Sequence, residues 1–119
     1  MARDQEIPKN VFIVLNTQLI PIKKEVTRLG RLPNNDVIIS EADISRFHAE
    51  IHFRKGKFIL KDLNARNGTF INGEQISSQA LQSGDTITIG GTPLLFIDRS
   101  EKIVEKMNKE TVSLDDLDL

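Results

Sequence analysis

The chain has 119 residues, 39% of them apolar, a formal net charge of −1, and no Cys, Trp or Tyr. This length allows one domain with a core of Ile, Leu, Val and Phe, while the absence of cysteine excludes disulfides and favours a reducing compartment. The near-neutral charge argues against nucleic-acid binding, and no apolar run resembles a signal peptide or the roughly 20 residues of a membrane span, so we expect a cytoplasmic protein without membrane insertion.

Short apolar or alternating stretches, separated by turns rich in Gly, Asn and Pro, follow one another from residue 11 onward. This pattern is typical of an antiparallel β-sandwich. Residues 1–9 are polar and we expect them to be flexible. Pro21 cannot donate to a strand ladder, which places its strand at a sheet edge or ends it at a bulge. Strands are predicted over residues 11–15, 19–23, 26–29, 37–39, 47–53, 58–63, 69–71, 74–76, 86–89 and 93–98.

Residues 47–53 alternate most clearly between apolar and polar side chains. Phe47 falls on the apolar face of this alternation, and His48 and His52 fall on the polar face. The pattern predicts a half-buried strand, with His52 meeting solvent.

Two further stretches carry turn or loop signals. Asn72-Gly73 is a strong signal for a type I′ hairpin turn, because both central residues of that turn need φ > 0. Residues 77–83 show no strand pattern, and we expect an irregular segment with Leu81 buried.

Residues 99–119 are expected to form an acidic tail or linker after a domain that spans residues 10–98. Ser100 could cap a short helix over residues 101–109, with Ile103, Val104 and Met107 on one face, although so short a helix is marginal alone. The tail is therefore expected to be helical or flexible. It could be free, or it could lead to further domains of a larger protein.

Four short motifs fall between residues 29 and 73, where strand patterns stop or restart. They offer hydroxyl, amide and guanidinium groups, but no cysteine pair, no paired carboxylates and no histidines at metal-ligand spacing with further ligands. This inventory suits anion binding better than catalysis, and we expect no cofactor and no metal. The motifs are Leu29-Gly30-Arg31, Ser45-Arg46-Phe47-His48, Arg66-Asn67-Gly68-Thr69 and Asn72-Gly73.

The ordered set of motifs, with strand-like spacers, resembles the forkhead-associated (FHA) domain over residues 10–98. The resemblance implies an all-β sandwich of about eleven short strands whose loops bind a phosphothreonine peptide, and hence a partner protein phosphorylated by a Ser/Thr kinase. A domain of this fold that binds an unphosphorylated protein surface is the alternative. If Thr111 were phosphorylated, the tail would be a candidate ligand for this fold, but an unmodified linker is the simpler interpretation.

Five residues are expected to contact the phosphopeptide. The Arg31 guanidinium is permanently charged and can bind two phosphate oxygens at once. The Ser45 hydroxyl can donate to a phosphate oxygen, and Arg46 can add a charge at the rim. The resemblance implies that Asn67 binds the peptide backbone. Arg66 stands where the family often has Ser or Thr, so it either replaces that contact with a longer, charged one or lies near the peptide.

His48 and Ser45 form the one pair that suggests a hydrolase, such as a small esterase. No third orienting group and no G-x-S-x-G motif accompany them, so we reject catalysis. The resemblance makes His48 structural, bracing the loop that carries Ser45. Structural support of the site is also expected from Gly30, Gly68, Asn72 and Gly73.

Overall fold

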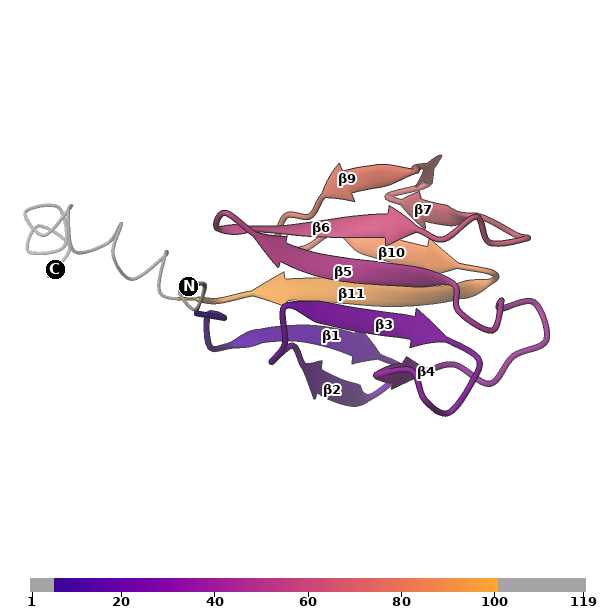
Figure 1. The fold of residues 1–119 in the computed structure, drawn as a ribbon, viewed down its shortest axis with the longest axis horizontal. Coiled ribbons are helices and arrows are strands. Elements are labelled where there is room, and N and C mark those ends of the chain that lie inside the picture. The colour runs from indigo at the N-terminus through magenta and orange to yellow at the C-terminus, as the bar shows by residue number, and fades with distance from the viewer. Residues whose placement is uncertain (1–5, 101–119) are drawn as a thin grey trace, which may run out of the picture.

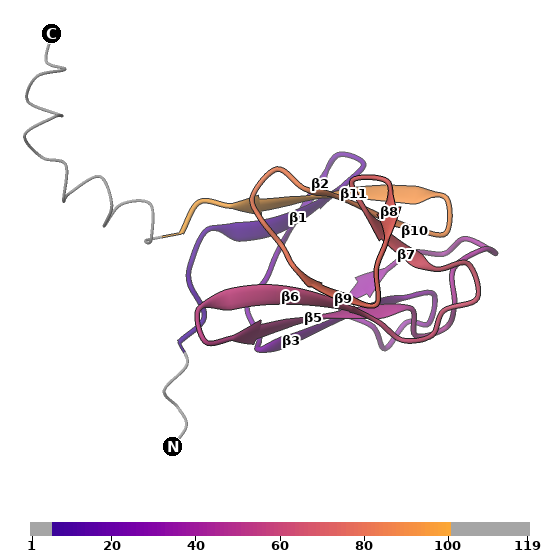
Figure 2. The same ribbon diagram turned by 90° about the horizontal axis from the view of Figure 1, so that it is seen from above.

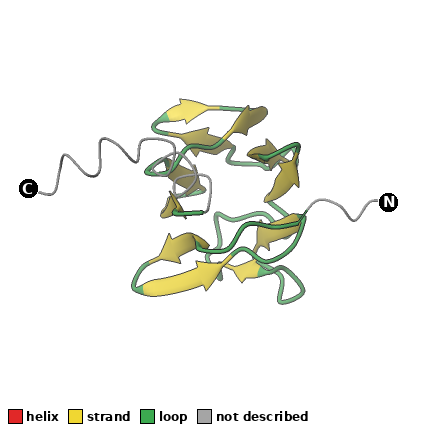
Figure 3. Ribbon diagram, turned by 90° about the vertical axis from the view of Figure 1, so that its left-hand side faces the viewer, coloured by secondary structure: helices red, strands yellow, loops and turns green. Residues whose placement is uncertain are grey.

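Residues 6–100 are described in a computed structural model of the chain. They form eleven strands and contain no helix, so none that could cross a membrane (Figures 1 and 3). The predicted all-β fold is confirmed, whereas the helix expected over residues 101–109 and Thr111 lie outside the described residues. The strands are β1 (Val11–Leu15), β2 (Gln18–Pro21), β3 (Val26–Gly30), β4 (Val37–Ile38), β5 (Ala49–Arg54), β6 (Lys57–Asp62), β7 (Thr69–Ile71), β8 (Glu74–Gln75), β9 (Ser78–Ala80), β10 (Thr86–Ile89) and β11 (Thr92–Asp98).

The strands form two sheets that pack face to face as a sandwich (Figure 2). The six-stranded sheet has the order β2-β1-β11-β10-β7-β8, and the five-stranded sheet has the order β4-β3-β5-β6-β9. β3 and β4 pair in parallel, while the other strand pairs of the described residues are antiparallel. Strand β2 lies at a sheet edge, as predicted from the missing proline N–H, and it ends at Pro21 and not at residue 23.

The core lies between the sheets and is built by period-two alternation on each strand. In β1, Val11, Ile13 and Leu15 are buried, while the two residues between them are only partly covered. Phe58 of β6 links the sheets, because its ring lies 5.6 Å from that of Phe96 in β11. The aliphatic and Phe side chains thus supply the core that the composition predicted.

Two hairpin turns use left-handed backbone at both central residues. Asn72 and Gly73 have φ values of 51° and 88°, and Lys55 and Gly56 have 51° and 79°. Positive φ at both positions is the requirement of a type I′ turn, whose twist matches that of the flanking strands. The hairpin predicted at Asn72-Gly73 is confirmed by the pairing of β7 with β8.

The strand predicted over residues 47–53 begins two residues later, at Ala49. Phe47, predicted to be on the apolar face, is 43% exposed, and His48, predicted to be on the polar face, is fully buried, so the prediction was wrong for both. The reason lies in hydrogen bonding, since the His48 ring has a partner for each nitrogen inside the fold. His52 is half-buried, and its Nε2 lies 2.8 Å from Glu50 Oε1.

Residues 78–80 form a strand, β9, where the sequence predicted an irregular segment. All three residues of β9 are exposed, so no apolar alternation marks them in the sequence. β9 exists through its pairing with β6, in which Ile59 lies opposite Ala80. The prediction that Leu81 is buried is confirmed.

Both ends of the described chain lie at one end of the sandwich, and the connections that carry the motifs lie at the opposite end (Figure 1). β3 ends there, β5 begins there, and β6 leads there into β7. The three connections, residues 31–36, 39–48 and 63–68, therefore meet although they are far apart in the sequence.

Candidate functional site

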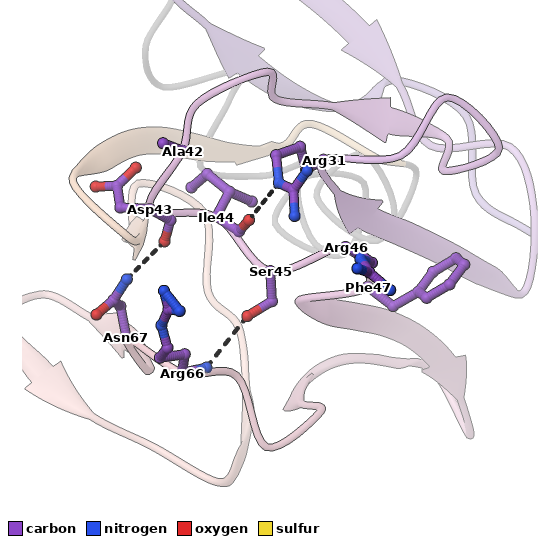
Figure 4. A pocket seen from close by; sticks show the side chains of 9 residues that line it. All are labelled: Arg31, Ala42, Asp43, Ile44, Ser45, Arg46, Phe47, Arg66 and Asn67. Atoms are coloured by element: carbon purple, nitrogen blue, oxygen red, sulfur yellow. Dashed lines mark hydrogen bonds between the residues drawn. The ribbon is translucent and has the colours of Figure 1, made fainter.

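The motif loops surround one open pocket at the end of the sandwich, with a volume of about 370 Å³ (Figure 4). The five residues expected to contact a phosphopeptide all line it, together with four residues that were not expected to contact a ligand. The lining residues are Arg31, Ala42, Asp43, Ile44, Ser45, Arg46, Phe47, Arg66 and Asn67.

Arg31 follows the last residue of β3 and is fixed at two points. Its backbone N–H donates to the carbonyl oxygen of Ser45 at 3.1 Å, and its Nε donates to the carbonyl oxygen of Ile44 at 3.0 Å. These bonds orient the guanidinium beside Ser45 and leave its terminal nitrogens free of protein carboxylates among residues 6–100 (Figure 4). A fixed guanidinium with free terminal N–H groups can bind an oxyanion through two parallel hydrogen bonds.

Gly30 allows the Arg46 backbone to approach the end of β3. A Cβ atom at Gly30 would clash with the carbonyl oxygen of Arg46 and would lie 2.8 Å from Nδ2 of Asn35. The Asn35 amide, which is buried, donates to that same Arg46 oxygen at 2.9 Å and to the carbonyl oxygen of Leu32 at 2.9 Å. Gly30 is therefore required by close packing, not by backbone φ.

Ser45 offers its hydroxyl to the pocket. Its Oγ accepts a hydrogen bond of 3.1 Å from the backbone N–H of Arg66, which ties the 39–48 connection to the 63–68 connection. Because this bond uses a lone pair, the hydroxyl proton remains available to donate to an anion.

His48 is fully buried beneath Ser45. The Ser45 backbone N–H donates to Nδ1 at 3.1 Å, so Nε2 carries the proton and donates to the carbonyl oxygen of Gly68 at 2.8 Å. The neutral ring thus joins the two connections from below. These are the contacts that a bracing role requires, and with both nitrogens bound to backbone the ring does not contact the Ser45 hydroxyl as a general base would.

Asn67 lies across the pocket from Arg31 (Figure 4). Its Nδ2 donates to the carbonyl oxygen of Asp43 at 2.8 Å, which leaves its Oδ1 free to accept from a ligand N–H. The next residue, Gly68, has φ of 78°, and a Cβ there would lie 2.7 Å from the Gln75 amide. Gly68 therefore permits the turn that presents Asn67.

The pocket carries an excess of positive charge. Arg31, Arg46 and Arg66 line it, and within residues 6–100 no carboxylate forms an ion pair with any of them. Asp43 is the one acidic lining residue, and its Oδ2 accepts a 2.8 Å hydrogen bond from the backbone N–H of Gly91. An anion with about two negative charges would balance this arrangement.

Four lining residues were not expected to contact a ligand: Ala42, Asp43 and Ile44 lie outside the motifs, and Phe47 lies within one. Asp43 and Ala42 belong to a polar loop without a recognisable motif. Phe47 was predicted to be on the apolar face of a strand, so no contact with a ligand was expected for it. The one feature of the sequence that could have indicated Asp43 as a pocket residue is its position two residues before Ser45, in the same loop.

Asn72 and Gly73 do not line the pocket. Asn72 joins the β7–β8 turn to the start of β10, since its Nδ2 donates to Asp85 Oδ1 at 2.9 Å and its Oδ1 accepts from the Thr86 N–H at 2.9 Å. Their contribution to the site is therefore the shape of the β7–β8 hairpin. No group of His, Cys, Asp or Glu side chains suited to a metal ion occurs within residues 6–100.

The sequence model of the FHA domain family matches residues 27–90, more than half of the chain. The chain belongs to the FHA family. This FHA domain is 38% identical over 76 residues to an oxoglutarate dehydrogenase inhibitor from Corynebacterium efficiens, which covers 64% of this chain and 54% of that protein. It is 34% identical over 76 residues to the glycogen accumulation regulator GarA from Mycolicibacterium smegmatis, covering 64% and 48%. The chain thus spans about half the length of these relatives.

Solved structures of FHA domains share the fold. EmbR from Mycobacterium tuberculosis, solved in complex with a low-affinity phosphopeptide, is 31% identical with a TM-score of 0.70, covering 82% of this chain and 26% of EmbR. The MEK1 FHA domain, solved in complex with a phosphothreonine peptide of HOP1, is 26% identical with a TM-score of 0.67, covering 76% of this chain and 97% of that domain.

Proposed function

We propose that this FHA domain is a non-catalytic module that binds phosphothreonine in a partner protein, and that Arg31, Ser45 and Asn67 make the central contacts. The observation that carries the proposal is the convergence of a fixed guanidinium, a free hydroxyl proton and a free amide oxygen on one pocket. The two FHA structures solved with phosphopeptides support it.

Each group has a separate task in this proposal. The terminal nitrogens of Arg31 and the Ser45 hydroxyl bind oxygens of the phosphate, which carries about −1.5 to −2 charges near pH 7. The Asn67 Oδ1 accepts a backbone N–H beside the phosphorylated residue and holds the peptide extended. Arg46 and Arg66 add positive charge at the rim.

The partner is then a protein modified by a Ser/Thr kinase, and the domain serves signalling or assembly that depends on that kinase. The relatives named as an enzyme inhibitor and as a regulator of glycogen accumulation support a regulatory use. The absence of cysteine supports the predicted cytoplasmic location, which stays a prediction.

The test compares two peptide libraries that differ in the phosphate on one threonine. The proposal expects at least about ten-fold preference for the phosphorylated library, because a hydrogen bond to a charged group contributes about 1.5–3 kcal/mol. Equal capture of both libraries would favour binding of an unphosphorylated surface. Ester turnover that is lost on Ser45→Ala would favour a hydrolase.

A further inference from the structure

The outer face of the six-stranded sheet is apolar next to the end where the described chain stops. Because the alternate residues of β1 face the core, Phe12 and Val14 point outward. Their cross-strand neighbours on β2 and β11 extend the same surface. The rows are Pro21–Phe12–Ile97 and Leu19–Val14–Leu95.

The outer face of the five-stranded sheet is charged. Arg28 Nε lies 3.5 Å from Glu50 Oε2, and Glu50 Oε1 lies 2.8 Å from His52 Nε2. Such a face suits water, whereas the rows on the six-stranded sheet contain no charged residue. The two outer faces of one sandwich therefore have different chemistry.

The apolar rows enclose a groove of about 320 Å³, lined by Phe12, Val14, Leu19, Ile97 and Arg99. Leu19 is 60% exposed, the most exposed large hydrophobic side chain among residues 6–100. A contiguous apolar patch bordered by a cation is a typical interaction surface.

The segment that follows Ser100 matches this groove in position and composition. Arg99 lines the groove, and Ile103, only four residues further on, can lie at most about 14 Å from it. Residues 101–109 place apolar Ile103, Val104 and Met107 among charged residues. A tether this short gives an effective concentration in the millimolar range.

The border of the groove is cationic. Lys9 and Lys23 line a second hollow that continues from Phe12 and Pro21, so cations border the groove at the end where the chain leaves it. Residues 101–109 carry Glu101 and Glu105 but also three lysines, a net charge of +1, so the segment is matched to the groove by its apolar side chains and not by its net charge. We propose that residues 101–109 of the same chain dock in this groove through Ile103, Val104 and Met107.

The contact is measured by attaching a spin label to the full chain. The sequence has no cysteine, so Asn108→Cys gives a single labelling position. Strong paramagnetic broadening is expected for the methyl groups of Val14, Leu19 and Ile97, and little for the methyl groups of Val26 and Ile59 on the other sheet. Equal broadening of both sets, or none, would overturn the proposal.

Two variants of the labelled chain sharpen the test. The triple substitution Ile103→Ser, Val104→Ser and Met107→Ser should abolish the difference between the two sets of methyl groups. The matched control, Lys102→Ser with Glu105→Ser, keeps the net charge and all three apolar residues, and should retain the difference. Loss of broadening in both variants, or in neither, would overturn the assignment of the contact to the apolar side chains.

A mixed sample identifies which chain provides the segment. Isotope-labelled protein without a spin label is mixed with unlabelled protein that carries the spin label. Docking within one chain predicts no broadening of the groove methyl groups in this mixture. Broadening there would mean that a second copy occupies the groove and would overturn the proposal as stated.

Discussion

At residue scale, the pocket depends on side chains whose hydrogen bonds are only partly used. The Arg31 Nε donates to the Ile44 carbonyl oxygen, so its terminal nitrogens remain available to a ligand. The Ser45 Oγ accepts from the Arg66 N–H, so the hydroxyl proton remains available to donate. Each group is therefore oriented before a ligand arrives, which lowers the entropy lost on binding.

Arg31→Ala should weaken phosphopeptide binding about ten- to 150-fold, because the loss of a charged hydrogen-bonding partner costs about 1.5–3 kcal/mol. The side chain is exposed, so the melting temperature should change little. Calorimetric titration of one phosphothreonine peptide into both proteins measures the effect, with Arg54→Ala as a control at the opposite end of β5. Unchanged affinity would remove Arg31 from the site.

Ser45→Ala and His48→Ala should separate binding from stability. Ser45→Ala should lower affinity about ten-fold with little change in the free energy of unfolding. His48→Ala should lower the free energy of unfolding by about 1–3 kcal/mol, because it leaves the part-buried Ser45 N–H and the buried Gly68 carbonyl oxygen unpaired. Urea denaturation and peptide titration of both variants provide the measurements. A larger loss of stability in Ser45→Ala would reverse the two roles.

Arg66→Thr should make peptide binding less dependent on salt. The Arg66 side chain has no carboxylate partner among the described residues, so its field is screened only by ions, within about 10 Å at 0.1 M salt. Affinities are compared from low to high salt for the parent and the variant. Identical slopes would show that the Arg66 charge does not reach the ligand.

The motifs predicted the five pocket residues because the motifs fall in connections between strands. In an antiparallel sandwich, such connections lie close together at the ends of the sheets. The motifs could not predict Asp43, whose place depends on a hydrogen bond from Gly91 across 48 residues of sequence. Nor could they place Phe47, since apolar alternation does not show where an extended strand actually begins.

At element scale, local patterns identified strands but not their neighbours. β1 and the β7–β8 hairpin were predictable because burial and turn chemistry are local. β9 was not, because its residues are exposed and only the pairing with β6 makes them a strand. The parallel pairing of β3 with β4 likewise has no sequence signal.

The β3–β4 connection contains Asp36, the carboxylate whose pKa is shifted most clearly within residues 6–100. Burial raises the pKa of Asp36, but hydrogen bonds from Lys24 Nζ at 2.6 Å and from the Arg28 N–H at 2.8 Å outweigh it, and the pKa is lowered overall. The charged carboxylate therefore stabilises the fold above the unfolded pKa of about 3.9, and this contribution is lost as the pH falls through the lower folded value.

Asp36→Asn should accordingly reduce the free energy of unfolding at pH 7, by about 1 kcal/mol or less because Lys24 is exposed. The difference from the parent should shrink as the pH is lowered below about 4. Urea denaturation of both proteins at neutral and acidic pH measures it. A difference that is independent of pH would show that the Asp36 charge does not contribute.

At the scale of the whole molecule, the pocket depends on both sheets. Its connections adjoin β3, β5 and β6, and Gly91, in the β10–β11 turn, donates a hydrogen bond to Asp43 of the pocket lining. A ligand that binds only the folded chain stabilises all of it. A phosphopeptide at about 100 times its Kd should add about 2.7 kcal/mol to the free energy of unfolding, and the matched unphosphorylated peptide should add almost none. Thermal unfolding with each peptide tests this, and equal shifts would contradict phosphate recognition.

The hydrogen bonds that close the pocket also bear on how the chain folds. They join residues that are 13, 24 and 48 positions apart in the sequence. The intervening chain must be brought together before these bonds can form. Contacts between distant residues are slow to form, because the entropy of loop closure is lost before they contribute. Hairpins such as β5–β6 can form early in folding, while the binding surface is completed with the last long-range contacts. A nascent or partly unfolded chain would therefore be unable to recognise its ligand, even where all the residues of the four motifs are present.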